Sequence, residues 1–350
     1  MKVLKKTFCG LLLAGLCQQA MGQDSHFSQF YHSPLTLNPG LTGKIKEDFR
    51  VGLIHRSQWK AVNSAFVTSA VFADINFIKN PFKLDAWGVG FFALNDEVGD
   101  GIFSNQQIAV SISGIKTLDE LKRHRITFGI QPNYVRKGLS ANSLVFDSQI
   151  NSGYQTDRSL SSGEQLSSQY GFFNFNAGLF YEFVLSKKIE LFAGYSANNI
   201  LRPKESPLAT SNGNLPVRHV LNPGLVYKIN QKWSLTPNFL LMQQATATDI
   251  NLGLFAAYTF NPEKPLATTA FLGPWYRVKD AAIAMAGLKW GHYQLAFSYD
   301  FTVSKFRDVK NATDDVPKNA AVGAWEVSFI YVGFLKRALP NETTIPCKFF

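Results

Sequence analysis

Residues 292–304, HYQLAFSYDFTVS, alternate between two kinds of side chain. The odd-numbered positions are all apolar or aromatic, while the even-numbered positions are polar or small, which is a strict period of two. Strands of globular proteins usually span about 3 to 10 residues, whereas a tilted strand needs about 9 to 11 residues to cross a membrane. We therefore predict that this stretch is one strand of a transmembrane β-barrel, with its aromatic face toward lipid and its polar face toward the lumen.

The composition of the whole chain agrees with this prediction. Aromatic residues make up 14% of the sequence and charged residues 17%, against about 25% charged residues in soluble domains. The mean hydropathy is −0.05. A helical membrane protein would be far more hydrophobic, whereas the two faces of barrel strands average to a value near zero. After the first 22 residues no stretch offers 18 uncharged apolar residues, so we expect the chain to cross the membrane through strands.

The N-terminus has the pattern of a secretory signal peptide. Three lysines precede the apolar run 8–16, and Ala20 and Gly22 supply small residues at the two positions that determine cleavage. We expect residues 1–22 to be removed before Gln23. The apolar run is too short for a membrane anchor, and Leu16 stands where a lipoprotein signal would need a small residue, which disfavours lipidation of Cys17.

Removal of the signal peptide changes the cysteine count and the charge. Cys347 would be the one remaining cysteine, so no intrachain disulfide is expected. Three lysines leave with the signal, and the formal charge falls from +10 to 32 − 25 = +7. This excess favours outer-membrane lipid headgroups and lipopolysaccharide, although scattered loop lysines that keep the exported chain soluble explain it equally well. A nucleic-acid partner is not expected for an exported chain.

Strand-like segments follow one another from residue 49 to the C-terminal region. We predict an all-β protein, a transmembrane antiparallel β-barrel of about 14 strands within residues 49–350, because bacterial single-chain barrels have an even number of strands. The predicted strands are roughly 49–60, 63–77, 85–95, 101–116, 124–137, 171–184, 188–201, 217–229, 232–243, 246–260, 267–278, 280–290, 291–304 and 322–335.

The lengths of the connections suggest an orientation. The three longest polar stretches, 138–170, 202–216 and 305–321, follow strands five, seven and thirteen and would all emerge on one side. Long extracellular loops opposite short periplasmic turns are typical of outer-membrane barrels, and an even strand count places both termini in the periplasm. Pro223 and Pro237 remove ladder donors, so they suggest bulges or misplaced strand boundaries.

The sequence contains no recognisable catalytic motif. Six histidines are spread singly, without a zinc-binding pattern, a nucleophile elbow or a phosphate loop. His292 and Asp300 share one face of a predicted strand but lie roughly 27 Å apart at about 3.4 Å per residue, too far to cooperate. A turn with Asp96, Glu97 and Asp100 could bind calcium, but a solvated turn fits better because no EF-hand spacing is present. We therefore expect that the protein is not an enzyme and that it binds neither a metal ion nor a cofactor.

Two terminal segments do not fit the strand pattern. Residues 27–43, FSQFYHSPLTLNPGLTG, concentrate aromatic and leucine side chains without helical or strand period. We expect residues 23–48 to bury these groups, either as a plug in the barrel mouth or against a partner. The tail 345–350 ends in Phe350, and this terminal aromatic resembles the ends by which barrel-assembly machinery recognises its clients.

Several motifs in order resemble one family. They are FSQFYxxPLxLNPxxxG near the N-terminus, HRSQW at 55–59, FLGPWYR at 271–277, AGLKWGHYQLAFSYDFTVSK, GAWEVSF and a cysteine-containing tail. Together they resemble the PorP/SprF family of type IX secretion system membrane proteins over nearly the whole mature chain. The chain departs from the family pattern at Gly40, where alanine is favoured, at His55, where an aromatic residue is favoured, and in the last three residues.

The resemblance implies an outer-membrane β-barrel of Bacteroidota that works in or beside type IX secretion. Some members resemble core components linked to a periplasmic peptidoglycan-associated assembly, and others serve the export or surface attachment of secreted proteins, including gliding adhesins. We expect the family motif to form a docking surface for such partners at the periplasmic mouth. The alternatives are an outer-membrane pore for small solutes and, more remotely, a barrel-embedded hydrolase. The predicted partner-binding residues are Gln29, Phe30, Tyr31, Leu37, Asn38, Pro39, Gly43, Arg56, Gln58 and Trp59.

Overall fold

The computed structural model describes residues 24–59, 66–77, 84–99, 101–140, 144–151, 153, 155–161, 168–205, 213–264, 266–304 and 323–335. The predicted signal peptide and the C-terminal tail lie outside the described residues. No helix in the described part of the chain is long and apolar enough to cross a membrane.

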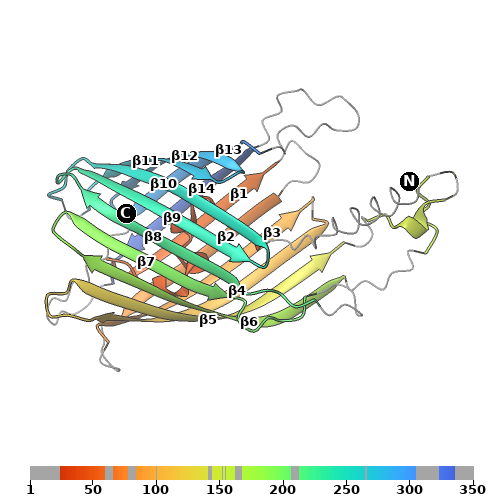
Figure 1. Cartoon of the computed structure of the whole chain (residues 1–350), viewed down its shortest axis with the longest axis horizontal. Helices are drawn as coiled ribbons and strands as arrows, with labels where there is room; N and C mark the ends of the chain where they lie inside the picture. Colours follow the sequence, from red (N-terminus) through yellow and green to blue (C-terminus); the bar gives the residue numbers. More distant parts are fainter. Residues whose placement is uncertain are drawn as a thin grey trace, which may run out of the picture.

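Fourteen antiparallel strands form a closed barrel in which each strand pairs with its neighbours in sequence and the first strand pairs with the last (Figure 1). The predicted barrel is therefore confirmed, and the predicted strands match the observed ones to within a few residues. The strands are β1 (Phe49–Gln58), β2 (Phe66–Phe77), β3 (Ala86–Val98), β4 (Phe103–Thr117), β5 (His124–Leu139), β6 (Gln169–Val184), β7 (Ile189–Asn198), β8 (Arg218–Lys228), β9 (Trp233–Gln244), β10 (Ala247–Thr259), β11 (Thr269–Arg277), β12 (Ala281–Trp290), β13 (Tyr293–Thr302) and β14 (Gly323–Gly333).

Side chains alternate between the two faces of the wall. In β13, Leu295 and Phe297 are 44% and 50% exposed on the outside, whereas Ala296 and Ser298, which alternate with them, are buried inside. The other strands repeat this alternation, which places Leu, Val, Phe and Tyr on the outer surface. The outward apolar face and the inward polar face are as predicted from residues 292–304, because the period of the side chains equals the period of the strand.

The two ends of the barrel differ in their connections. Connections after the odd-numbered strands lie at one end, and they include the long ones after β5, β7 and β13; we call this the long-connection end. The opposite, short-turn end holds the even-numbered connections, the start of β1 and the end of β14. In the turn between β4 and β5, the backbone N–H of His124 donates to Asp119 and lowers the pKa of that carboxyl.

The prediction of bulges at Pro223 and Pro237 is wrong. Between β8 and β9, Leu221 pairs with Leu241 on one side of the interruption and Gly224 with Asn238 on the other, so the register is unchanged. Both prolines point outward, and the ladder loses individual pairs near them without gaining an extra residue. A closed barrel tolerates this because the neighbouring pairs hold the register.

The predicted turn at Asp96 and Glu97 is also wrong, because β3 continues to Val98. Asp96 points into the barrel and is 8% exposed, whereas Glu97 is exposed. Asp100 lies outside the described residues. Polar residues are acceptable at inward positions of a barrel strand, so their presence did not mark the end of the strand.

Residues 24–48 lie inside the barrel, and we call them the lumenal segment. They form three short helical turns, η1 (Phe30–His32), α2 (Pro34–Leu37) and η2 (Pro39–Leu41). Asp24 contacts Gln244 and Asn199 at the long-connection end, and the N–H of Asp48 donates to Gly333 at the short-turn end. The lumenal segment therefore runs through the length of the barrel. The expectation that both termini lie on one side rested on the even strand count, which fixes only the start of β1 and the end of β14. Residue 24 lies at the opposite end, and the termini themselves are outside the described residues.

Candidate functional site

The apolar side chains of the lumenal segment are buried against the inner wall. Phe30 meets Trp275 edge to face with ring centroids 5.2 Å apart, and Tyr31 meets Phe255 in the same way at 4.6 Å. Leu37 and Leu41 belong to the same cluster of buried residues. Full burial of each large apolar side chain contributes about 1.5–3 kcal/mol, so this cluster is a strong attachment of the segment to the wall.

A second apolar cluster holds the segment on the opposite side of the lumen. Phe27 and Leu35 pack there with Phe72 and Phe92, which point inward from β2 and β3. The two clusters together account for the aromatic and leucine residues that have no strand or helix period in the sequence. Their partners are side chains of the barrel itself.

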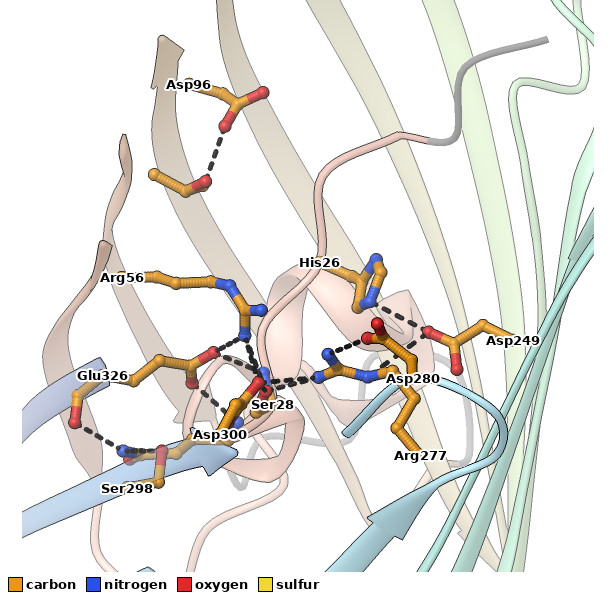
Figure 2. Close-up of polar contacts among 12 residues, drawn as sticks. His26, Ser28, Arg56, Asp96, Asp249, Arg277, Asp280, Ser298, Asp300 and Glu326 are labelled. Atoms are coloured by element: carbon orange, nitrogen blue, oxygen red, sulfur yellow. Dashed lines mark hydrogen bonds and ion pairs between the residues drawn. The ribbon is translucent and has the colours of Figure 1, made fainter. Parts of the chain in front are cut away.

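Ser28 and Gln29 form the polar centre of the lumenal segment (Figure 2). Their backbone N–H groups donate to the two carboxylate oxygens of Glu326, at 2.6 and 2.8 Å. The Ser28 hydroxyl donates to Asp300 at 2.6 Å, and the Gln29 amide donates to Ser298 at 3.0 Å. These contacts join the segment to β13 and β14, almost 300 residues away in the sequence.

Two buried arginines neutralise the carboxylates around Ser28. Arg56 pairs with Glu326 and, at 3.2 Å, with Asp300. Arg277 pairs with Asp300 at 3.3 Å and with Asp280 at 3.0 Å. Both guanidinium groups also donate to the Ser28 hydroxyl, so Figure 2 shows one connected network around this residue.

The middle of the lumenal segment lies directly on the wall. A Cβ atom at Gly178 of β6 would come within 1.9 Å of the Asn38 side-chain oxygen, and one at Gly43 would come within 2.6 Å of the Gly88 Cα. Gly43 also has a φ of +65°, which favours glycine. The Asn38 amide donates to the backbone oxygens of Leu179 and, at 3.2 Å, of Tyr195. Small residues at these positions let two backbones approach closely.

At the short-turn end, buried ion pairs fix the last part of the segment. Lys44 and Arg125 both pair with Glu182, and Arg50 pairs with Asp74 at 2.7 Å. Asp74 also accepts a hydrogen bond from the N–H of Gly43, at 2.7 Å. Lys289 pairs with Glu47 at 3.6 Å. The cavity at this end has a volume of only about 40 Å³.

The long-connection end holds a larger pocket of about 410 Å³, which we call the end pocket. The start of the lumenal segment forms part of its wall, and Arg56, Gln58 and Trp59 line it from the end of β1. Asp96 and Asp249 lie in its wall on β3 and β10. His26 pairs with Asp249 at 2.9 Å. Among the described residues, no group of three or more His, Cys, Asp and Glu side chains could hold a metal ion.

The ten residues predicted from the family motif fall into two groups. Gln58 and Trp59 line the end pocket. The others lie inside the barrel: Gln29, Phe30, Leu37, Asn38, Pro39, Gly43 and Arg56 are buried, and Tyr31 is half-buried. The structure thus brings most of them together through contacts with the chain's own wall. Their role in partner binding stays a prediction.

Sequence reasoning assigned no role to the carboxylates that hold this network. Asp300, Glu326 and Asp249 stand at inward positions of β13, β14 and β10. The one signal in the sequence that could have identified them is a charged residue at an inward position of a barrel strand. His292 and Asp300, which share a predicted face, do not meet: His292 contacts the Val332 backbone oxygen instead.

The fold and its surface define the class of protein. A closed antiparallel barrel with an apolar outer face is a transmembrane β-barrel. The family model of the type IX secretion system membrane protein PorP/SprF matches residues 19–314. The chain belongs to this family, and fold and family together place it in the outer membrane.

Similarities to other proteins are remote. No curated protein matches the sequence. Similar solved structures include the P. putida toluene transporter TodX, with 10% identity over 86% of this chain and 93% of that chain and a TM-score of 0.49. A Pseudomonas aeruginosa FadL homologue has 9% identity over 84% of this chain and 92% of that chain and a TM-score of 0.46. At these identities and TM-scores, neither likeness bears on what this chain does.

Proposed function

We propose that this chain is a scaffold or docking barrel of type IX secretion, which supports the export or surface attachment of secreted proteins such as gliding adhesins. The observation that carries the proposal is the lumenal segment, which fills the barrel with the chain's own residues. A pore for small solutes needs a continuous water path, and the buried clusters and ion pairs around this segment oppose one. A barrel without such a path acts through its surfaces.

We orient the barrel in the membrane as in other outer-membrane barrels, whose long loops are extracellular and whose short turns are periplasmic. In this orientation the end of β14 faces the periplasm, where a peptidoglycan-associated assembly and other secretion components would dock. The end pocket and Asp24 face the cell exterior, where a secreted protein or adhesin is available. The outer wall contacts outer-membrane lipid and lipopolysaccharide.

In this proposal the family-motif residues have two roles: some contact the partner and the others position the lumenal segment. Gln58 and Trp59 contact the partner directly, because they line the end pocket. The remaining eight hold the lumenal segment in place and so shape both ends of the barrel. Replacing Phe30 and Tyr31 by alanine would then lower partner retention by loosening the segment while the barrel stays in the membrane.

Quantitative proteomics of culture medium, cell surface and periplasm tests the function, comparing a clean deletion of the gene with its parent. General loss of exported proteins from medium and surface identifies a core component, and loss of one large protein identifies a dedicated partner. If every exported protein stays where it was in the parent, the secretion role fails and a pore for small solutes becomes the better explanation.

A further inference from the structure

The lining of the end pocket contains more carboxylates than arginines. Four carboxylates and two arginines line it. Two further carboxylates, outside the lining, lie within ion-pair distance of these arginines. His26 adds a positive charge only when it is protonated. The lining carboxylates are Asp24, Asp96, Asp249 and Asp280, the lining arginines are Arg56 and Arg277, and the two carboxylates behind them are Asp300 and Glu326.

Asp96 is the strongest indication that the excess of carboxylates in the pocket serves to bind a ligand. Its side chain is 8% exposed and lines the pocket, yet it forms no ion pair with any described residue. Its one hydrogen bond comes from the Thr68 hydroxyl at 2.5 Å. Figure 2 shows the Asp96 carboxylate standing apart from the network of Arg56 and Glu326. Lys137, His26 and Arg56 act on this carboxylate only from beyond ion-pair distance. A cationic ligand in direct contact would offset the cost of burying it.

A second carboxylate oxygen is also unsatisfied. Asp249 Oδ1 accepts no hydrogen bond from a described residue, whereas Oδ2 forms ion pairs with His26 at 2.9 Å and with Arg277 at 3.8 Å. Asp249 is 8% exposed and lines the same pocket. Asp96 and Asp249 stand on different strands, β3 and β10, so the two carboxylates line the pocket from two parts of the wall.

The remaining lining restricts the kind of cation. No cluster of three metal-binding side chains exists among the described residues, which disfavours a metal ion. Trp59 and Phe66 both line the pocket, with ring centroids 5.3 Å apart. Lysine and arginine side chains combine an apolar stem with a charged head, and the head is attracted to aromatic faces and carboxylates. The pocket of about 410 Å³ has room for such a side chain with its flanking backbone.

We propose that the end pocket binds a lysine- or arginine-bearing extended segment of the protein that this barrel exports or attaches. The inference rests on the proposed function for the identity of the partner. The basic side chain lies between Asp96 and Asp249, and its stem packs on Trp59. Asp96 is therefore a specificity-determining residue for a basic segment, while the arginines stay engaged with Asp300 and Glu326.

The test uses the purified full chain in detergent and a labelled peptide of three Gly-Lys repeats, with three Gly-Gln repeats as the neutral probe. Asp96→Asn keeps the shape of the side chain and an acceptor for Thr68. We expect it to weaken binding of the lysine peptide about tenfold, the size of one lost charge-assisted hydrogen bond. Asp147→Asn is the matched control, because Asp147 is exposed in the connection after β5, outside the pocket lining. It should leave the affinity within about twofold.

Equal affinities of the two variants, equal binding of the two peptides, or displacement of the lysine peptide by millimolar calcium ions would each overturn the inference. The same variants, expressed in the deletion strain, should separate the two proposals. Asp96→Asn should lower the amount of exported protein at the surface and Asp147→Asn should not. A deletion that leaves every exported protein in place refutes the secretion role, whereas a deletion phenotype that both variants rescue equally refutes the pocket.

Discussion

The two ends of the lumen are built from the same kinds of residue but pair their charges differently. At the short-turn end, Glu182, Asp74 and Glu47 each have a basic partner, and the remaining cavity is about 40 Å³. At the long-connection end, carboxylates outnumber arginines around a pocket of about 410 Å³, and Asp96 has no ion-pair partner among the described residues. One end is closed by charge pairs within the chain, whereas at the other end one buried carboxylate, Asp96, has no ion pair with a described residue.

The difference shows how a threaded segment can leave a barrel with one sealed end and one open end. Burying a charge is costly unless a partner with good geometry compensates it. The short-turn end meets this requirement with side chains from the segment and the wall, so it needs nothing further. The long-connection end meets it only in part, and a partner from outside the chain can complete it.

Removing the lumenal segment should abolish the difference between the ends. A chain without residues 24–47 loses both apolar clusters that fill the lumen and the Ser28 network. Fourteen strands enclose more space than the side-chain-filled interior of an eight-stranded barrel. We expect conductance in planar bilayers to rise by more than about tenfold relative to the full chain, because the wall side chains alone do not fill that space.

The comparison requires that the shortened chain still forms a barrel. Far-ultraviolet circular dichroism and the heat-dependent shift of its gel mobility check this before conductance is measured. A folded barrel without the segment that conducts no better than the full chain would mean that other residues close the lumen.

At the sealed end, Asp74→Ala should have the next largest effect. Asp74 is fully surrounded by protein, pairs with Arg50 and accepts the N–H of Gly43. Removing one partner of a buried pair leaves an uncompensated charge and costs about 3–5 kcal/mol. The free energy of unfolding in detergent, measured by urea titration, gives the value directly.

Lys116→Ala is the control for this substitution, because the Lys116–Asp85 pair is exposed and its atoms are 3.9 Å apart. It should change the free energy of unfolding by less than about 1 kcal/mol. Similar losses in the two variants would show that the short-turn end is not held by buried charge pairing.

The barrel wall was predictable from the sequence because every strand carries its own signal. The period of two repeats in each strand and places apolar residues on the lipid face regardless of distant contacts. Asp96 shows the limit of this reasoning: polar residues ended the predicted strand at 95, whereas β3 continues to Val98. In a barrel the inward face accepts polar groups, so polarity alone does not separate a strand end from the lumen.

The lumenal site was not predictable in the same way. Residues 27–43 show no period, and the partners of Ser28 and Gln29 stand almost 300 residues later in β14. No local pattern records a contact between such distant positions. From the sequence we predicted that this segment must bury its apolar groups. Whether a charged residue such as Glu326 is paired could not be predicted, because its partners depend on which residues the closed barrel places opposite Glu326.

Between the two ends, Gly178→Leu should have the smallest of these effects. Gly178 faces the lumen from β6, and a Cβ there would lie 1.9 Å from the Asn38 side-chain oxygen and 3.0 Å from Pro39 Cδ. The leucine side chain therefore has to displace the middle of the lumenal segment, and overpacking of this kind costs about 1–3 kcal/mol. Ala177→Leu adds a similar side chain one residue away on the outward face, where lipid accommodates it. Hydrogen exchange of the amides in residues 35–44 measures the response. Faster exchange in Gly178→Leu alone means that the segment is held by close contact with the wall. Equal exchange in both variants means that the two ends hold it without help from the middle.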